Sequence, residues 1–170
     1  MPESIFLIGP MGAGKTTIGR QLAKILNMRF VDCDQAIEER TGVKIPVIFE
    51  IEGEAGFRKR ESAMLSELTA QPNIVLATGG GVILSEDNRR LLRSRGHVVY
   101  LQTSVDTQLE RTRNSRNRPL LDTEDRRARL EEIMQLRAPL YRLEADQIID
   151  TEGRSPTKAA QVIAEKIEAK

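Results

Sequence analysis

Residues 9–16 read Gly-Pro-Met-Gly-Ala-Gly-Lys-Thr, and this stretch decides the fold. It matches the pattern G-x-x-x-x-G-K-[ST], in which glycines let backbone N–H groups turn inward around a phosphate. Lys15 can reach the β- and γ-phosphates of a nucleotide, and the Thr16 hydroxyl can ligate Mg²⁺. An apolar run, Ile5–Ile8, precedes the stretch and an amphipathic helical pattern, Lys15–Leu26, follows it. Because the motif requires this strand–loop–helix context, the stretch predicts an ATP-binding P-loop.

Short apolar runs alternate with helical patterns along the rest of the chain. Strands that alternate with helices indicate βαβ units and a parallel sheet, and runs without polar alternation indicate strands covered on both faces. The sequence therefore predicts an α/β fold of the P-loop NTPase type, with three αβα layers around a five-stranded parallel sheet. Ligands bind such sheets beyond the carboxyl ends of the strands. The other strand candidates are Phe30–Asp32, Ile74–Ala77, Val98–Leu101 and Gln147–Ile149, and helices are expected over Phe57–Leu68, after Ser85 and after Ser155.

Composition narrows the class of protein. The 170 residues include 26 Lys and Arg and 25 Asp and Glu, a formal net charge of +1, which gives no general reason to expect nucleic-acid or membrane-surface binding. The chain shows no signal-peptide pattern and no apolar stretch near the ~18 residues of a membrane helix. Cys33 is the single cysteine, so no internal disulfide can form. We expect one cytoplasmic domain over residues 1–170, working as a monomer.

Two carboxylates, Asp32 and Asp34, follow the second predicted strand. If the backbone is extended there, both side chains point the same way, toward the P-loop. Asp32 could support Mg²⁺, and Asp34 could accept the proton of a substrate hydroxyl. The structural alternative is that Asp34 caps a helix over residues 35–40, but the neighbouring P-loop favours catalysis. Cys33 is expected to be buried and inert, and the lone His97 structural, which leaves a carboxylate as the natural base.

Two arginines interrupt helical patterns. Arg58 lies three residues before Glu61, so the two are neighbours on a helix, and Arg137 lies where an apolar stripe would continue. An internal ion pair with Glu61 would satisfy these cations, but a guanidinium also matches a substrate carboxylate in bidentate geometry. The residues alone favour neither reading. Gly79–Gly81 ends the third strand and permits close backbone approach to a ligand, although it could be a simple turn.

These segments together resemble the shikimate kinase family over almost the whole chain. A P-loop alone indicates only a superfamily, whereas the other motifs in this order and spacing are specific. The motifs are Gly9–Thr17, Asp32-x-Asp34, Gly53-Glu54-x-x-Phe57-Arg58-x-x-Glu61, Gly79-Gly80-Gly81, Arg118-Pro119-Leu120-Leu121 and Arg137-x-Pro139-Leu140-Tyr141.

The resemblance implies transfer of the γ-phosphate of ATP to the 3-hydroxyl of shikimate, a step toward chorismate and the aromatic amino acids. It also implies a fold like that of nucleoside monophosphate kinases, with a substrate-binding helical segment at about 33–61 and a lid at about 112–124. Pro46 departs from the family, whose helix commonly continues there, and can shift the start of that helix. The alternatives are another small-molecule kinase, such as a gluconate kinase, and a nucleotide-dependent regulatory switch.

The resemblance assigns roles to individual residues. Asp34 would be the base and would bind the shikimate hydroxyls, while Arg58 and Arg137 would clamp the shikimate carboxylate. Lys15, Mg²⁺ and Arg118, which comes from the lid, would stabilise the moving phosphoryl group. Shikimate would also contact Gly79, Gly80 and Gly81; Mg²⁺ would be held by Thr16 and Asp32; and ATP would contact Gly12, Ala13, Gly14, Lys15, Thr16, Thr17, Arg111, Arg118, Arg154 and Pro156.

Overall fold

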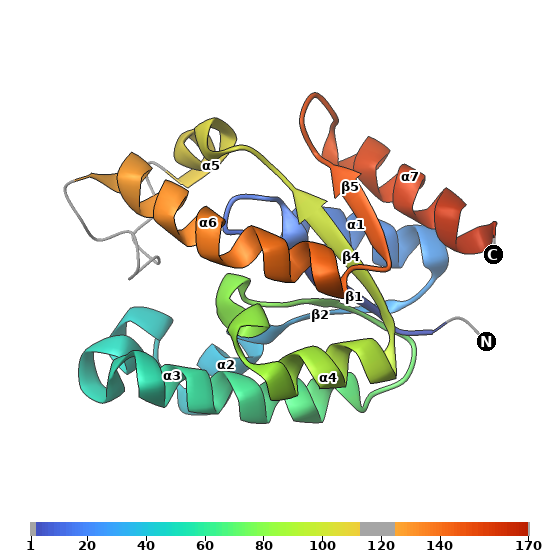
Figure 1. Cartoon of the computed structure of the whole chain (residues 1–170). Coiled ribbons are helices and arrows are strands. Elements are labelled where there is room, and N and C mark those ends of the chain that lie inside the picture. Colours follow the sequence, from blue (N-terminus) through green and yellow to red (C-terminus); the bar gives the residue numbers. More distant parts are fainter. Residues whose placement is uncertain (1–2, 113–124, 170) are drawn as a thin grey trace.

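A computed structural model of the chain describes residues 3–112 and 125–169, and its centre is a parallel sheet (Figure 1). The strand order β2-β3-β1-β4-β5 places β1, which leads into the P-loop, in the middle of the sheet. The predicted five-stranded parallel sheet is therefore confirmed, with the strand ends within two residues of their expected positions. The strands are β1 (Ile5–Ile8), β2 (Arg29–Asp32), β3 (Ile74–Ala77), β4 (His97–Gln102) and β5 (Gln147–Asp150).

Helices cover both faces of the sheet, because successive side chains of each strand point to opposite sides. Ile5 and Leu7 of β1 face a core formed with α1 and α7, whereas Phe6 and Ile8 face a second core formed with α2, α3, α4 and α6. These two cores give the three αβα layers that the sequence predicts. The helices are α1 (Lys15–Leu26), α2 (Cys33–Thr41), α3 (Ile45–Thr69), α4 (Glu86–Arg95), α5 (Val105–Thr112), α6 (Arg126–Glu144) and α7 (Pro156–Glu168), with a short 3₁₀ helix, η1 (Gly80–Leu84), after β3.

Helix α3 begins twelve residues before the predicted Phe57. Pro46 lies in its first turn, where a missing N–H costs no hydrogen bond, and Glu38 of α2 accepts the N–H of Ile45 at 2.9 Å. Gly53 interrupts the helix with φ 73°, a conformation that glycine adopts without strain. The predicted helix is thus the second half of α3, and Pro46 lies in the first turn of the first half without interrupting it.

The expected helix caps are present. The Ser85 hydroxyl accepts the N–H of Asn88 at the start of α4, and the Ser155 hydroxyl accepts that of Lys158 at the start of α7. His97 is buried at the start of β4, 3.2 Å from the side-chain oxygen of Gln147, as a structural histidine would be. The described residues include no helix with the length and apolarity to cross a bilayer. Apart from Thr112, the predicted lid lies outside these residues.

Candidate active site

The P-loop bends around Lys15. Gly14 adopts a left-handed conformation, φ 91°, immediately before α1, so the first turn of the helix opens onto the loop. Position 9 requires glycine for two reasons. Its φ is 147°, which other residues rarely adopt, and a Cβ there would lie 2.6 Å from the carbonyl oxygen of Leu101. The Lys15 ammonium donates to the carbonyls of Gly9 and Pro10, which are parts of the same loop. The loop therefore forms a compact anion-binding site with the Lys15 ammonium inside it.

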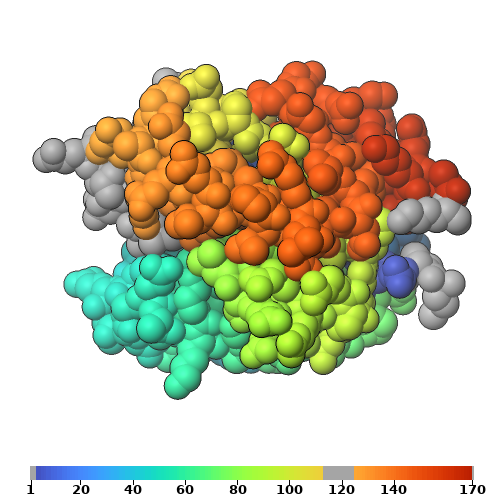
Figure 2. All heavy atoms as spheres, in the orientation of Figure 1, coloured from blue at the N-terminus to red at the C-terminus, as the bar shows by residue number. Residues whose placement is uncertain are grey.

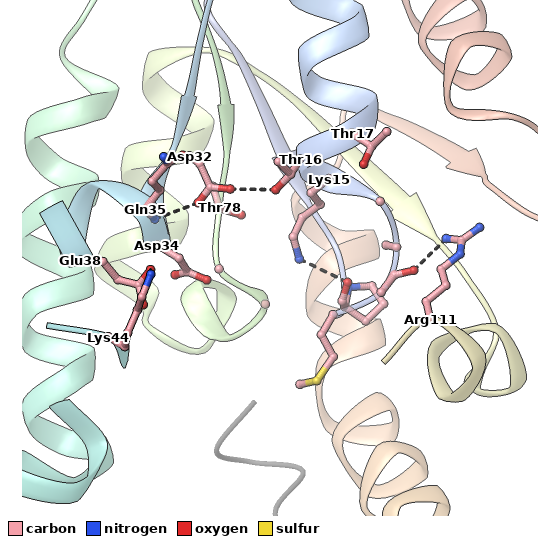
Figure 3. A pocket seen from close by; sticks show the side chains of 17 residues that line it. Lys15, Thr16, Thr17, Asp32, Asp34, Gln35, Glu38, Lys44, Thr78 and Arg111 are labelled. Atoms are coloured by element: carbon pink, nitrogen blue, oxygen red, sulfur yellow. Dashed lines mark hydrogen bonds and ion pairs between the residues drawn. The ribbon is translucent and has the colours of Figure 1, made fainter. Parts of the chain in front are cut away.

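A cavity of about 540 Å³ opens at the carboxyl ends of β1, β2 and β3 (Figure 3). Asp34 extends into it from α2 and Lys15 from α1, so a carboxylate and a phosphate-binding cation share one space. Most of the residues predicted to bind ATP, metal or acceptor line it. These are Gly12, Ala13, Gly14, Lys15, Thr16, Thr17, Asp32, Asp34, Gly79, Gly80 and Arg111.

The backbone is extended at Asp32, as expected from sequence, but it is already helical at Asp34. Asp32 ends β2 and caps α2, since its Oδ1 accepts the N–H of Gln35 at 3.1 Å, whereas Asp34 lies within the first turn of the helix. The alternative that Asp34 is the cap is therefore also wrong. Both carboxylates still reach the cavity because α2 starts directly at the strand end. Asp32 Oδ2 also accepts the hydroxyl of Thr16 at 2.7 Å, which brings the two predicted metal-site residues together.

Cys33 is fully buried between these two carboxylates. Burial raises the pKa of its thiol, and the nearby negative charges of Asp34, Glu61 and Asp32 raise it further. The thiolate is the reactive form of cysteine, so the structure supports the expectation of an inert side chain.

Arg58 forms the internal ion pair that the sequence left open. Its Nη1 lies 2.9 Å from Glu61 Oε1, and its Nη2 lies 3.3 Å from Glu54 Oε2. Glu61 is only 1% exposed, and burial raises the pKa of its carboxyl, opposed by the charges of Arg58, Arg137 and Lys15. This buried carboxylate orients the guanidinium of Arg58, which keeps part of its surface open to solvent.

Gly79 and Gly81 leave room for the charged side chains of the site. A Cβ on Gly79 would lie 2.6 Å from Glu61 Oε2 and 3.1 Å from Asp34 Oδ1. A Cβ on Gly81 would overlap the guanidinium of Arg58. Neither glycine is a simple turn residue, because both allow the backbone to approach these groups closely.

Gly80 approaches Arg137 and the P-loop instead. A Cβ there would lie 3.5 Å from Arg137 Nη1, and the Tyr141 hydroxyl donates to the Gly80 carbonyl. Arg137 is 6% exposed and makes no direct ion pair among the described residues. Burial lowers the pKa of Arg137 and Arg58 acts in the same direction, while Tyr141 opposes them. Since no described carboxylate contacts its guanidinium directly, Arg137 is well suited to bind an anionic ligand group.

The residues outside the P-loop that are predicted to bind ATP lie farther apart. Arg111, at the end of α5, donates from Nη1 to the Gly12 carbonyl at 2.7 Å and lines the cavity. Arg154 lies between β5 and α7, and Pro156 is the first residue of α7; neither is among the residues that line the cavity. Arg118 falls outside the described residues.

Outside the P-loop, sequence reasoning missed four residues that line the cavity. Glu38 and Lys44 form a loose pair, with 3.8 Å between Nζ and Oε1, and no motif marks either of them. Thr78 was visible as the residue after an apolar run, and its hydroxyl donates to the Leu7 carbonyl at 2.8 Å, joining β3 to β1. The fourth is Gln35, in the first turn of α2.

Glu152 was also missed, although it connects the loop before α5 to the loop that carries Arg154, a predicted ATP-binding residue. Its carboxylate accepts hydrogen bonds from the backbone N–H of Ser104 at 2.8 Å and from the hydroxyls of Thr107 and Thr103. The Ser104 N–H, followed by the Thr107 hydroxyl, lowers the pKa of Glu152 from 4.5 to about 2. The loop before α5 is thereby fixed to the loop that carries Arg154.

We expect Glu152→Gln to lower the melting temperature by roughly 2–4 °C, the effect of about one net hydrogen bond. Because the folded pKa lies below the unfolded one, the stabilisation is complete above about pH 4.5 and is lost as the pH falls toward 2. Thermal unfolding of both proteins across this range should show the difference shrinking with acid. Glu165→Gln, on the exposed face of α7, is the matched control. If the melting temperatures of wild type and Glu152→Gln differ by the same amount at every pH, the lowered pKa of Glu152 is contradicted.

Comparison with known proteins identifies the family. The family model described as shikimate kinase matches residues 11–168. A shikimate kinase of Thioalkalivibrio sulfidiphilus is 62% identical over 95% of this chain and 85% of its own length, and one of Methylococcus capsulatus is 57% identical over 95% and 90%. Among solved structures, shikimate kinase from Acinetobacter baumannii in complex with shikimate superposes with a TM-score of 0.98 at 48% identity, over 99% of this chain and 94% of that one. A gluconokinase from Sinorhizobium meliloti, at 16% identity and a TM-score of 0.60, shares the fold alone. The chain belongs to the shikimate kinase family.

Proposed function

We propose that this protein transfers the γ-phosphate of ATP to the 3-hydroxyl of shikimate. The observation that carries the proposal is the placement of Asp34 and Lys15 in one cavity, whose wall includes Gly79 and Gly80. The guanidinium of Arg137 lies beside Gly80, and that of Arg58 lies beside the next residue, Gly81. A hydroxyl acceptor needs a base opposite the donor phosphate, and an acceptor carboxylate needs cations at a fixed distance from that hydroxyl. Shikimate carries both groups, and the similar structure from Acinetobacter baumannii is described with shikimate bound.

The donor half of the site consists of the P-loop and its lysine. Lys15 offsets the charge that develops on the phosphoryl group, and Arg118, which lies outside the described residues, is proposed to add a second cation there. Thr16 and Asp32 would hold Mg²⁺, whose preference for oxygen ligands their hydroxyl–carboxylate pair fits. When bound, the ion would neutralise phosphate charge. The described residues contain no cluster of three or more His, Cys, Asp or Glu side chains suited to a metal, and nucleotide phosphates and water would supply the other ligands.

The acceptor half is built from α2, α3, α6 and the glycine segment. Asp34 takes the proton of the attacking hydroxyl, while Arg58 and Arg137 hold the shikimate carboxylate. Glu61 orients Arg58 for this contact, at 2.9 Å. We further propose a single domain that works as a monomer in the cytoplasm; the substrate-binding segment at about 33–61 and the lid at about 112–124 belong to the same proposal.

A coupled assay tests the acceptor directly. The protein is supplied with MgATP and shikimate, gluconate or no acceptor, and ADP release is followed. We expect turnover only with shikimate, and the product to carry phosphate on the 3-hydroxyl by ³¹P and ¹H NMR. Equal ADP release with and without shikimate would support a nucleotide switch, and release with gluconate would support the other kinase.

A further inference from the structure

The 3₁₀ helix η1, light green in Figure 1, is held from α4 by two side chains that bind its backbone carbonyls. The Asn88 amide donates to the Val82 carbonyl at 3.1 Å, and Arg89 Nη1 donates to the Ile83 carbonyl at 2.8 Å. Both donors lie in the first turn and a half of α4. They satisfy acceptors that a helix of one or two turns leaves without internal partners.

Arg89 is held in turn by Glu144, the last residue of α6. The Glu144 side chain is fully buried, and its Oε1 lies 3.0 Å from Arg93 Nη1 and 3.7 Å from Arg89 Nε. Figure 2 shows the orange residues of α6 lying directly against the green residues of η1 and α4. A buried carboxylate requires compensating cations, so Glu144 constrains where the Arg89 guanidinium can lie.

The same face of α6 reaches the acceptor site. Arg137, Tyr141 and Glu144 follow one another at intervals of four and three residues, which places them in one row along the helix. Arg137 lies beside Gly80, and Tyr141 donates to the Gly80 carbonyl. One face of α6 therefore carries three residues with related positions. Arg137 is predicted to bind the shikimate carboxylate, Tyr141 binds the glycine segment, and Glu144 contacts Arg89, which binds η1.

We propose that Glu144 and Arg89 are positioning residues for the shikimate-binding half of the site. They hold the carbonyl end of η1, so that Gly79 to Gly81 keep their close approach to Asp34 and Arg58. This inference rests on the proposed function. Loss of either residue loosens the glycine segment and weakens shikimate binding, whereas the P-loop, which neither residue contacts, keeps its affinity for ATP.

The test compares KM for shikimate with KM for ATP in Glu144→Gln and Arg89→Met. Glu144→Gln keeps the shape of the side chain and removes its charge. Arg89→Met keeps an apolar side chain and removes the donor to the Ile83 carbonyl. Because Glu144 still pairs with Arg93 in Arg89→Met, this variant should fold. For each we expect KM for shikimate to rise about five- to tenfold, the effect of one lost hydrogen bond, with KM for ATP unchanged. Arg89→Lys should recover part of the loss.

The control is Arg93→Met. Arg93 also pairs with Glu144, but it is half exposed and does not contact η1, so its loss should leave both KM values unchanged. Melting temperatures are recorded for all variants. A lowered melting temperature with wild-type KM for shikimate, or a rise in both KM values alike, would overturn the positioning role. A wild-type protein that does not phosphorylate shikimate would instead refute the proposed function, which separates the two failures.

Discussion

Asp34→Asn is expected to lower kcat with shikimate about 10²- to 10⁴-fold, the usual contribution of a positioned general base. The substitution keeps the size of the side chain, so the cavity wall and the first turn of α2 should be unchanged. The amide lacks the basic oxygen that takes the proton of the attacking hydroxyl. Because Asp34 lies across the cavity from the P-loop, the affinity for MgATP should stay at the wild-type value.

Steady-state kinetics with varied shikimate measure the effect, and calorimetric titration with a non-hydrolysable ATP analogue measures nucleotide affinity. Glu39→Gln is the matched control, because it makes the same chemical change at an exposed position of the same helix. An Asp34→Asn protein with kcat within a few-fold of wild type would remove Asp34 as the base. A parallel loss of nucleotide affinity would indicate a general disturbance of the cavity.

The fold was largely predictable because the sheet is covered on both faces. Each buried strand is then a short apolar run, and Ile5–Ile8 and Ile74–Ala77 were placed at their observed bounds. The first half of α3 was not predictable in the same way. Its start depends on Glu38, seven residues earlier, and its interruption at Gly53 hides the helical period from any single window of sequence.

The site was predictable as a set of residues but not as a set of contacts. Spacing alone indicates that Arg58 and Glu61 are neighbours on a helix, and they pair at 2.9 Å. Spacing cannot show whether Arg137 shares that carboxylate, because the answer depends on how α6 packs over α3 and η1. Glu144 illustrates the same limit, since a Glu near a helix end is usually a surface residue and only the packing of α6 on α4 buries it.

The role of Gly79 to Gly81 becomes clear only from their tertiary contacts. In sequence the triple glycine permits a turn or a ligand contact equally well. In the structure two of the three positions would place a Cβ against charged side chains of the acceptor site, and the third lies between Arg137 and the P-loop. The segment thus lies where the two halves of the site meet, and the glycines at 79 and 81 leave space for those charged side chains.

Arg137→Met is expected to raise KM for shikimate about 10²- to 10³-fold, the cost of removing one partner from a buried, hydrogen-bonded charge pair. The guanidinium is 6% exposed and, among the described residues, makes no ion pair that would have to be broken. An apolar side chain of similar length removes a desolvated cation, but it also removes a charge that offsets the burial of Glu61, so the melting temperature should change little. Arg142→Met, on the exposed side of the same helix, is the matched control for both measurements.

The methyl ester of shikimate converts this expectation into a test of the contact itself. The ester lacks the negative charge, so wild-type enzyme should lose efficiency with it, whereas Arg137→Met should treat shikimate and its ester nearly alike. The variant and the ester together form a double-mutant cycle. The amount by which their losses in catalytic efficiency fail to add gives the energy of the Arg137–carboxylate interaction. If the variant instead keeps the wild-type preference for free shikimate, the carboxylate is bound elsewhere. Arg58, already paired with Glu61 and Glu54, would then have to hold the carboxylate without Arg137.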